Sequence, residues 1–207
     1  MSTAPSENLA TTSDTAGANT VSPPLASSRN SSSDSTVSAT TPDWSREKCT
    51  FGKWEPGKRL LRAIRRYQYW KGRAGPIGWL LAKRAVLSHR FWSAVTGADI
   101  PLTTRIAGGL SIPHPNGIVI HPASTIGPNC LLFQQVTLGY GGTTAGHPTI
   151  GGHVDIGAGA KLLGGITIGN HAKIGANAVV LCDVPAGATA VGIPARIIPP
   201  PDGEKAP

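Results

Sequence analysis

A six-residue repeat in the C-terminal half of the chain restricts the fold more than any other feature. Aliphatic residues occupy every sixth position from Ile120 to Val180, with Thr144 as the exception. Glycine directly follows many of these positions, and a small or β-branched residue comes four positions after most of them. Six residues can form one short strand and one corner, so three repeats make a triangular coil. Stacked coils at the sheet spacing of ~4.8 Å then bury their aliphatic rows against each other. The repeat therefore predicts a three-sided parallel β-helix.

The repeat contains a local insertion that carries a histidine. The aliphatic positions continue upstream of Ile120, but Ile112 and Ile120 are eight residues apart instead of six. Two extra residues therefore enter within 113–117, and His114 lies among them. Insertions into a regular ladder often re-aim a side chain at a functional site. The alternative is an exposed corner with an incidental histidine.

A glycine-rich segment marks a second irregularity, over residues 139–148. It keeps the six-residue frame but places Thr144 in an aliphatic position, and His147 lies near its end. We expect a short loop that leaves the wall of the prism. The glycines alone do not indicate phosphate binding, because no P-loop motif is present.

Composition divides the chain into a disordered tail at 1–42, a basic helical element at 43–97, a β-helix domain at 98–198 and a C-terminal tail at 199–207. The first tail is rich in Ser, Thr, Ala and Asn and carries almost no large apolar side chains, so it cannot offset its ordering entropy by burial. Apolar spacing predicts helices over 57–72 and 76–96, with Pro76 at a start and Gly97 at a stop.

Positive charge is concentrated in the helical element. Thirteen of the 19 Lys and Arg lie between Arg46 and Arg90, against two acids, Glu47 and Glu55. A solvated helical surface, attraction to an anionic membrane through residues 46–90, and attraction to a phosphate-bearing substrate all remain open. Nucleic acid is not expected as a partner, because no binding motif accompanies the charge.

The cellular location follows from three observations on the sequence. No apolar segment has the form of a signal peptide or reaches the ~18 residues of a membrane span. Cys49, Cys130 and Cys182 are few and lack metal-ligand spacing, as expected of ordinary buried thiols in a reducing compartment. We therefore expect a cytoplasmic protein, with peripheral membrane contact as the open alternative stated above.

An imidazole and a carboxylate lie at a spacing that suits proton transfer. His114 can act as a general base near neutral pH, and a carboxylate improves such a base by fixing its tautomer. Asp99 precedes His114 by fifteen residues, which is close to one coil. The two side chains are therefore expected on adjacent coils at one edge of the prism.

Several runs resemble the serine acetyltransferase family, one of the hexapeptide acyltransferases. They are Asp99-Ile100-Pro101, His114-Pro115-Asn116-Gly117-Ile118-Val119-Ile120, Gln135-Val136-Thr137-Leu138-Gly139, His147-Pro148-Thr149-Ile150-Gly151, Ile156-Gly157-Ala158-Gly159-Ala160-Lys161 and Gly192-Ile193-Pro194-Ala195-Arg196. The resemblance implies a left-handed β-helix and O-acetyl transfer from acetyl-CoA without a metal. It also implies that His114 is the base, that Asp99 orients it, and that His147 positions the reacting group.

The resemblance further implies a binding groove and an assembly. Acetyl-CoA is expected beside the small residues of later coils, which points to Ala158, Gly159, Ala160, Lys173 and Ala176. Members of the family are homotrimers with active sites between subunits. His114 and His147 are five hexads apart and so fall on different faces of one prism, which fits a site completed across a subunit boundary, although a folded loop could also join them.

The sequence departs from the family where serine would be recognised. Serine acetyltransferases usually carry Asp directly before the first histidine and Arg directly before the second, and this chain has Pro113 and Gly146 there. A zwitterion without charged partners binds poorly. We therefore expect a sugar or glycan acceptor from exopolysaccharide or envelope synthesis, as in polysaccharide-associated members, with the small molecule serine as the alternative acceptor.

Two further classes of function stay open. His153 and His171 are eighteen residues apart and should stack at one corner, as two ligands of a carbonic anhydrase-like metal site would. Zinc needs at least three protein ligands, and the sequence offers no evident third. A scaffold without catalytic activity is the other class.

Overall fold

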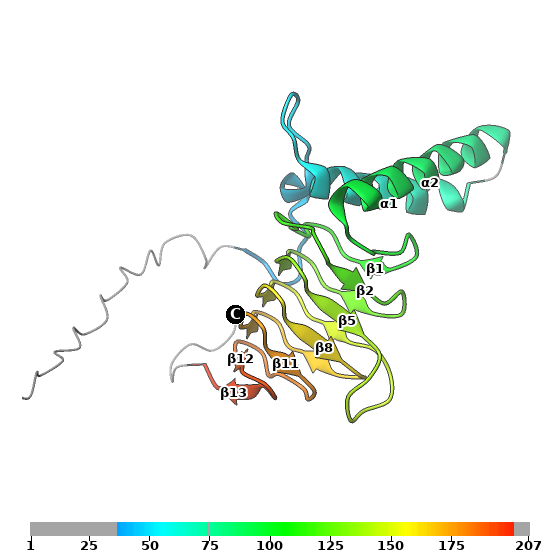
Figure 1. The fold of residues 1–207 in the computed structure, drawn as a ribbon. Coiled ribbons are helices and arrows are strands. Elements are labelled where there is room, and N and C mark those ends of the chain that lie inside the picture. Colours follow the sequence, from blue (N-terminus) through cyan, green and yellow to red (C-terminus); the bar gives the residue numbers. More distant parts are fainter. Residues whose placement is uncertain (1–36, 74, 201–207) are drawn as a thin grey trace, which may run out of the picture. The chain divides into compact units, whose positions relative to one another are not determined.

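The computed structural model describes residues 37–73 and 75–200 (Figure 1). The sequence predictions for residues 1–36 and 201–207 lie outside this part of the chain. The helices are η1 (Trp44–Glu47), α1 (Pro56–Lys71) and α2 (Pro76–Thr96). The strands are β1 (Arg105–Ile106), β2 (Val119–Ile120), β3 (Thr125–Ile126), β4 (Leu131–Leu132), β5 (Thr137–Gly139), β6 (Thr149–Ile150), β7 (Asp155–Ile156), β8 (Lys161–Leu163), β9 (Thr167–Ile168), β10 (Lys173–Ile174), β11 (Val179–Val180), β12 (Thr189–Val191) and β13 (Arg196–Ile198).

The strands form three sheets, one for each face of a prism. Their orders are β1-β3-β6-β9, here the β3 sheet; β13-β12-β10-β7-β4, the β4 sheet; and β11-β8-β5-β2, the β2 sheet. Consecutive strands always belong to different sheets until β12, and all pairs are parallel except the antiparallel pair of β12 and β13. The chain therefore winds around the prism once for every three strands, as the six-residue repeat predicts.

The repeat positions form the core. Every aliphatic residue at a sixth position between Ile120 and Val180 is at most 3% exposed. The small residues four positions later, among them Ser124, Val136 and Ala172, are completely buried in the same interior. Thr144 is exposed, because the loop that contains it leaves the coil. Burial of these two rows is the main stabilising contribution to the domain.

The two helices cover the first coil. Helix α1 begins at Pro56, and α2 ends at Thr96 because Gly97, with a φ of 65°, stops it, so both helices lie within one residue of the predicted ranges. Leu60 and Ile64 of α1 join the same apolar cluster as Ile112 of the first coil. Gly57 permits this approach, since a Cβ there would lie 2.4 Å from the carbonyl oxygen of Ile112.

A half-buried ion pair fixes α1 to the coil. Arg65 donates to the Glu47 carboxylate from Nε at 3.0 Å and from Nη2 at 2.8 Å. The same carboxylate accepts the backbone N–H of Gly109 at 2.9 Å. Arg65 also donates to the carbonyl oxygen of Ala107 at 2.6 Å. These charge-assisted bonds join helix, 3-10 turn and first coil.

Residues 37–42 differ from the sequence prediction, which placed them in the disordered tail. The Asn129 amide donates from Nδ2 to the carbonyl oxygens of Ser38 at 2.7 Å and Thr41 at 2.8 Å. Its Oδ1 accepts the N–H of Asp43 at 2.7 Å. The segment is therefore ordered by one buried amide of the β-helix, which its own composition does not reveal.

Candidate active site

His114 lies at an edge of the prism that contains an insertion. Ser111 pairs with Leu131, twenty residues later, whereas Val119 pairs with Thr137, eighteen residues later. The two extra residues predicted between Ile112 and Ile120 are thus present in the structure. They carry the exposed His114 around the corner between the β4 sheet and the β2 sheet. We call this corner, with residues 113–118, 133–136, 157–160 and 175–178, the His114 edge.

The imidazole of His114 lies against the next coil. Its ring is nearly parallel to that of Phe133, with a centroid distance of 6.5 Å and an interplanar angle of 24°. Phe133 is half-buried and follows β4 directly, so its own position is fixed by the core. The contact leaves His114 exposed on the outside of the prism, where a ligand can reach it.

Asp99 lies on the coil before His114, as the spacing predicts. Its backbone N–H donates to Ile118 at 2.8 Å and its carbonyl accepts from Ile120 at 2.9 Å. The Asp99 side chain is exposed on the β2 sheet side. Within residues 37–73 and 75–200, no hydrogen bond or ion pair joins the side chains of Asp99 and His114. The structure therefore brings their coils together without joining the two groups.

Most of the residues predicted to contact acetyl-CoA lie along the same edge. A ladder of backbone bonds runs from Gln135 to Asn116, from Gly159 to Gln134, and from Asn177 to Ala158, all at 2.8–2.9 Å. Ala158, Gly159 and Ala176 are therefore stacked above the coil of His114. Glycine is needed here, because a Cβ on Gly157 would lie 2.6 Å from the backbone nitrogen of Ala176.

The other two predicted residues present no side chain on the outside of this edge. Ala160 is completely buried, so its side chain faces the interior of the prism. Lys173 is exposed on β10, in the β4 sheet. Lys161, which the sequence did not single out, donates from Nζ to the carbonyl oxygen of Gln135 at 2.5 Å. It therefore places a positive charge beside the His114 edge, and its place directly after the glycine-alanine run is the signal that could have found it.

His147 lies at a different edge, between the β2 sheet and the β3 sheet, where the glycine-rich loop returns to β6. Its ring stacks on His121, with centroids 3.8 Å apart and planes at 5°. The ring of Tyr140 lies 5.9 Å away at 53°. His147 Nδ1 is buried and has no hydrogen-bond partner among the described residues. Within one chain His114 and His147 are thus separated, as the hexad count predicts.

The loop before His147 runs along neighbouring coils. The N–H of Gly165 donates to the carbonyl oxygen of Thr144 at 3.1 Å, and the Thr143 hydroxyl donates to that of Leu181 at 3.3 Å. Gly146 has a φ of 125°, and a Cβ there would lie 3.0 Å from the Cα of Gly165. A side chain at position 146 would therefore be strained in this loop.

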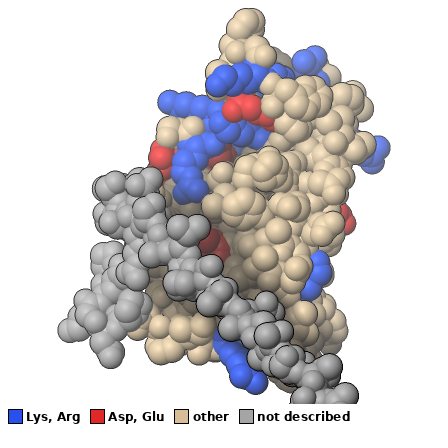
Figure 2. All heavy atoms as spheres, turned by 60° about the vertical axis from the view of Figure 1, so that its left-hand side comes forward, with Lys and Arg blue, Asp and Glu red and all other residues tan. Residues whose placement is uncertain are grey.

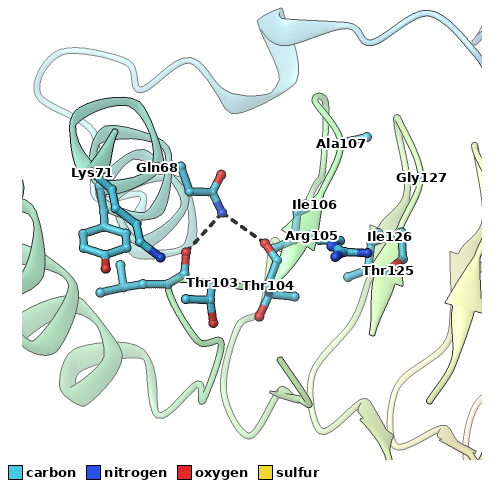
Figure 3. A pocket seen from close by; sticks show the side chains of 12 residues that line it. Gln68, Lys71, Thr103, Thr104, Arg105, Ile106, Ala107, Thr125, Ile126 and Gly127 are labelled. Atoms are coloured by element: carbon cyan, nitrogen blue, oxygen red, sulfur yellow. Dashed lines mark hydrogen bonds between the residues drawn. The ribbon is translucent and has the colours of Figure 1, made fainter. Parts of the chain in front are cut away.

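A surface hollow of about 570 Å³ lies between α1 and the first coils (Figure 3). Gln68 crosses it, donating from Nε2 to Leu102 at 3.1 Å and to Thr104 at 3.0 Å. Lys71 and Arg105 add positive charge to its wall. Its lining includes none of the predicted catalytic residues, so it is a separate feature of the surface.

His153 and His171 lie on neighbouring coils at the same corner, as their spacing predicts, with their rings edge to face. Their Nδ1 atoms lie 2.8 Å apart, so one ring donates a hydrogen bond to the other. In the part of the chain that the structure describes, no group of three His, Cys, Asp or Glu is placed to hold a metal ion. The carbonic anhydrase hypothesis therefore lacks its third ligand within these residues.

Comparison with a family model and with solved structures shows the class of fold to which this chain is similar. Residues 147–182 match the family model described as bacterial transferase hexapeptide (six repeats). The solved serine acetyltransferases of soybean and of Brucella abortus superpose with TM-scores of 0.58 and 0.59, at 38% and 33% identity. The matches cover 69% and 70% of this chain and 57% of each of those chains. The strands from β1 to β12 thus form a left-handed parallel β-helix, as predicted, and residues 147–182 of it match the hexapeptide-repeat family model.

The relatives found by sequence are similar to this chain over a shorter range and at higher identity. The serine acetyltransferase of Synechococcus elongatus is 44% identical over 126 residues, which are 58% of this chain and 52% of that protein. That of Helicobacter pylori strain J99 is 47% identical over 106 residues, 50% of this chain and 62% of that protein. The chain is therefore serine acetyltransferase-like, and it spans between about half and two thirds of the length of these relatives.

Proposed function

We propose that this protein is an acetyl-CoA-dependent O-acetyltransferase with His114 as its general base. The observation that carries the proposal is the placement of His114, exposed on a two-residue insertion at the edge where the small residues Ala158, Gly159 and Ala176 are stacked. An imidazole is suited to remove a hydroxyl proton near neutral pH. The likeness to serine acetyltransferases supports acetyl-CoA as the donor, held along the His114 edge.

The proposed reaction needs one proton transfer to His114 and one back. His114 accepts the proton of the acceptor hydroxyl while the hydroxyl oxygen forms a bond to the carbonyl carbon of the acetyl group. The bond from that carbon to sulfur then breaks, and the imidazolium returns the proton to the thiolate of CoA. We propose that Asp99 orients His114 once substrates are bound, because hydrogen bonds in catalytic sites are often long until the substrate complex forms.

Serine is the acceptor that the comparisons favour. The sequence departures at Pro113 and Gly146 led us to expect a sugar or glycan, but the relatives reported above are named serine acetyltransferases. The names of these relatives support O-acetylation of serine better than O-acetylation of a polysaccharide intermediate. We therefore propose serine as the first acceptor.

A neutral hydroxyl acceptor is the second candidate, because one observation on the loop favours it. Gly146 adopts a φ that side-chain-bearing residues rarely adopt, and it packs close to Gly165. The loop is therefore built without a cation at the place where the family carries arginine. Pro113 likewise supplies no carboxylate for an ammonium group.

We further propose a homotrimer with active sites between subunits. His114 and His147 lie at different edges of one prism, so a neighbouring subunit is needed to bring the two imidazoles to one acceptor. Light scattering of the purified protein measures this directly: a trimer mass is expected, and a monomer with full activity would contradict it.

An acceptor panel tests the proposed function. Release of CoA from acetyl-CoA is measured with serine, with neutral sugars and without acceptor. Turnover with serine alone supports serine O-acetylation, and turnover with sugars alone supports the second candidate. An enzyme that releases no CoA with any hydroxyl acceptor would overturn the proposal.

A further inference from the structure

Helix α2 presents an apolar stripe to the outside. Its members are Ile77, Leu80, Leu87, Phe91 and Val95, which are between 41% and 71% exposed. Their spacing of three, seven, four and four residues keeps them on one side of the helix. The buried residues of the helix, Gly78, Ala85 and Thr96, lie on the opposite side. Among the described residues, none packs over the stripe closely enough to bury these five side chains.

Cations lie beside and within this stripe, and neither α1 nor α2 contains Asp or Glu. Lys83 and Arg90 are exposed beside the stripe, and the exposed Arg84 lies on the stripe side of the helix, between Leu80 and Leu87. The two acids between residues 46 and 90 are already engaged, Glu47 with Arg65 and Glu55 with Lys58. Figure 2 shows Lys and Arg side chains gathered at the helical end of the face it presents. The helical hairpin is therefore a basic surface that carries an apolar stripe interrupted by Arg84.

The end of the hairpin adds aromatic side chains beside cations. A hollow of about 430 Å³ separates the last turn of α1 from the first turns of α2 and is lined by Trp70, Trp79, Lys71, Arg73 and Lys83 among others, without an acid. The Arg73 guanidinium lies 3.4 Å from the ring centre of Tyr69, which is exposed. In Figure 1 the last turn of α1 and the first turn of α2 lie at the end of the hairpin away from the coils.

We propose that α2 and the end of the hairpin dock on an anionic membrane surface, with the stripe lying in the interface between headgroups and acyl chains. Apolar side chains enter the interface, and flanking Lys and Arg contact anionic headgroups. Tryptophan favours the same depth, because its ring is apolar and its N–H is polar. No helix among the described residues is long and apolar enough to cross a bilayer. The attachment is therefore peripheral.

Charge favours a lipid surface over a second copy of the chain. Pairing this face with itself would bring Lys83, Arg84 and Arg90 toward their own copies, and like charges at an interface oppose association. Phosphatidylserine headgroups supply the opposite sign. The proposal does not depend on catalysis, so it stands or falls separately from the proposed function.

Vesicle flotation of the full chain tests the proposal. We expect co-flotation with vesicles of phosphatidylcholine mixed with phosphatidylserine, decreasing with salt, and little with phosphatidylcholine alone. The variant Lys83→Gln/Arg90→Gln should weaken the partition coefficient by about fivefold per lost charge. The control Arg105→Gln/Arg196→Gln removes the same charge from exposed positions of the β-helix and should bind like the wild type.

The apolar stripe is tested by Leu87→Glu/Phe91→Glu. This variant should lose flotation while its mass by light scattering stays unchanged. Equal flotation with both vesicle types, or equal weakening in the β-helix control, would overturn the proposal. A fall in oligomer mass without a change in flotation would also overturn it, and would identify the stripe as a contact between copies of the chain.

Discussion

His121 and His147, from neighbouring coils, stack with ring centres 3.8 Å apart and planes at 5°. His121 Nδ1 accepts the N–H of Ala123 at 3.1 Å, which fixes the His121 ring. His147 Nδ1 has no such bond among the described residues. The orientation of His147 therefore depends on its stack with His121, which makes His121 a positioning residue for the proposed reaction.

Three substitutions of His121 separate the stack from the hydrogen bond. His121→Phe keeps a flat ring, His121→Asn keeps an acceptor for Ala123, and His121→Ala loses both. We expect kcat for CoA release to stay near wild type in the first and to fall about ten- to hundredfold in the other two, because misplaced catalytic groups cost rates of this order. A phenylalanine variant as slow as the alanine variant would show that the stack does not position His147. NMR signals of the His147 ring report its orientation directly, which kcat alone does not.

Asn129 should hold the N-terminal segment against the β-helix. Its φ of 60° suits asparagine or glycine, so Asn129→Gly removes the side chain without backbone strain. The matched control is Asn177→Gly, at a φ of 56° on an exposed corner. Loss of the three bonds to Ser38, Thr41 and Asp43 should lower the free energy of unfolding by about 2 kcal/mol more than the control does.

Urea denaturation measures that difference, and limited trypsin digestion locates it. Cleavage after Arg46 or Lys48 should accelerate in Asn129→Gly and not in Asn177→Gly. Equal stability and equal cleavage in the two variants would mean that the amide bonds do not anchor the segment.

Cys130 should behave unlike the other two cysteines. Burial raises the pKa of its thiol to about 11 from an ordinary value of 9.0. Cys182 is exposed and Cys49 half-buried, so the expectation of three buried thiols was wrong for these two. Alkylation at pH 8 followed by mass spectrometry should label Cys182 first, then Cys49, and Cys130 only after unfolding. Rapid labelling of Cys130 in the folded protein would contradict the packing described here.

The raised pKa of Cys130 also predicts a change of stability with pH. The thiol loses its proton more readily in the unfolded chain, so its contribution to stability is present below pH 9 and is lost as the pH rises toward 11. Cys130→Ala should flatten this part of the stability curve, although the cavity lowers stability at every pH. An unchanged slope between these two pH values would contradict the assignment.

The sequence predicted the β-helix and both helices because their signals are periodic and local. The insertion at His114 was predicted for the same reason, because the spacing of eight residues between Ile112 and Ile120 breaks the six-residue repeat in the sequence itself. The partnership of His121 with His147 was missed, because it depends on how the intervening loop returns through its bonds to Leu181 and Gly165. The order of residues 37–42 was missed because Asn129, far away in sequence, supplies the bonds.

The central claim is that His114 takes the proton of the acceptor hydroxyl, and the kcat of CoA release by His114→Ala tests it most directly. His171→Asn is the control, because it removes a histidine far from the proposed site and keeps a residue that tolerates its φ of 59°. With the best acceptor of the panel, we predict that His114→Ala lowers kcat by about 10²–10⁴-fold while the control keeps wild-type activity. A His114→Ala enzyme with wild-type kcat would contradict the account.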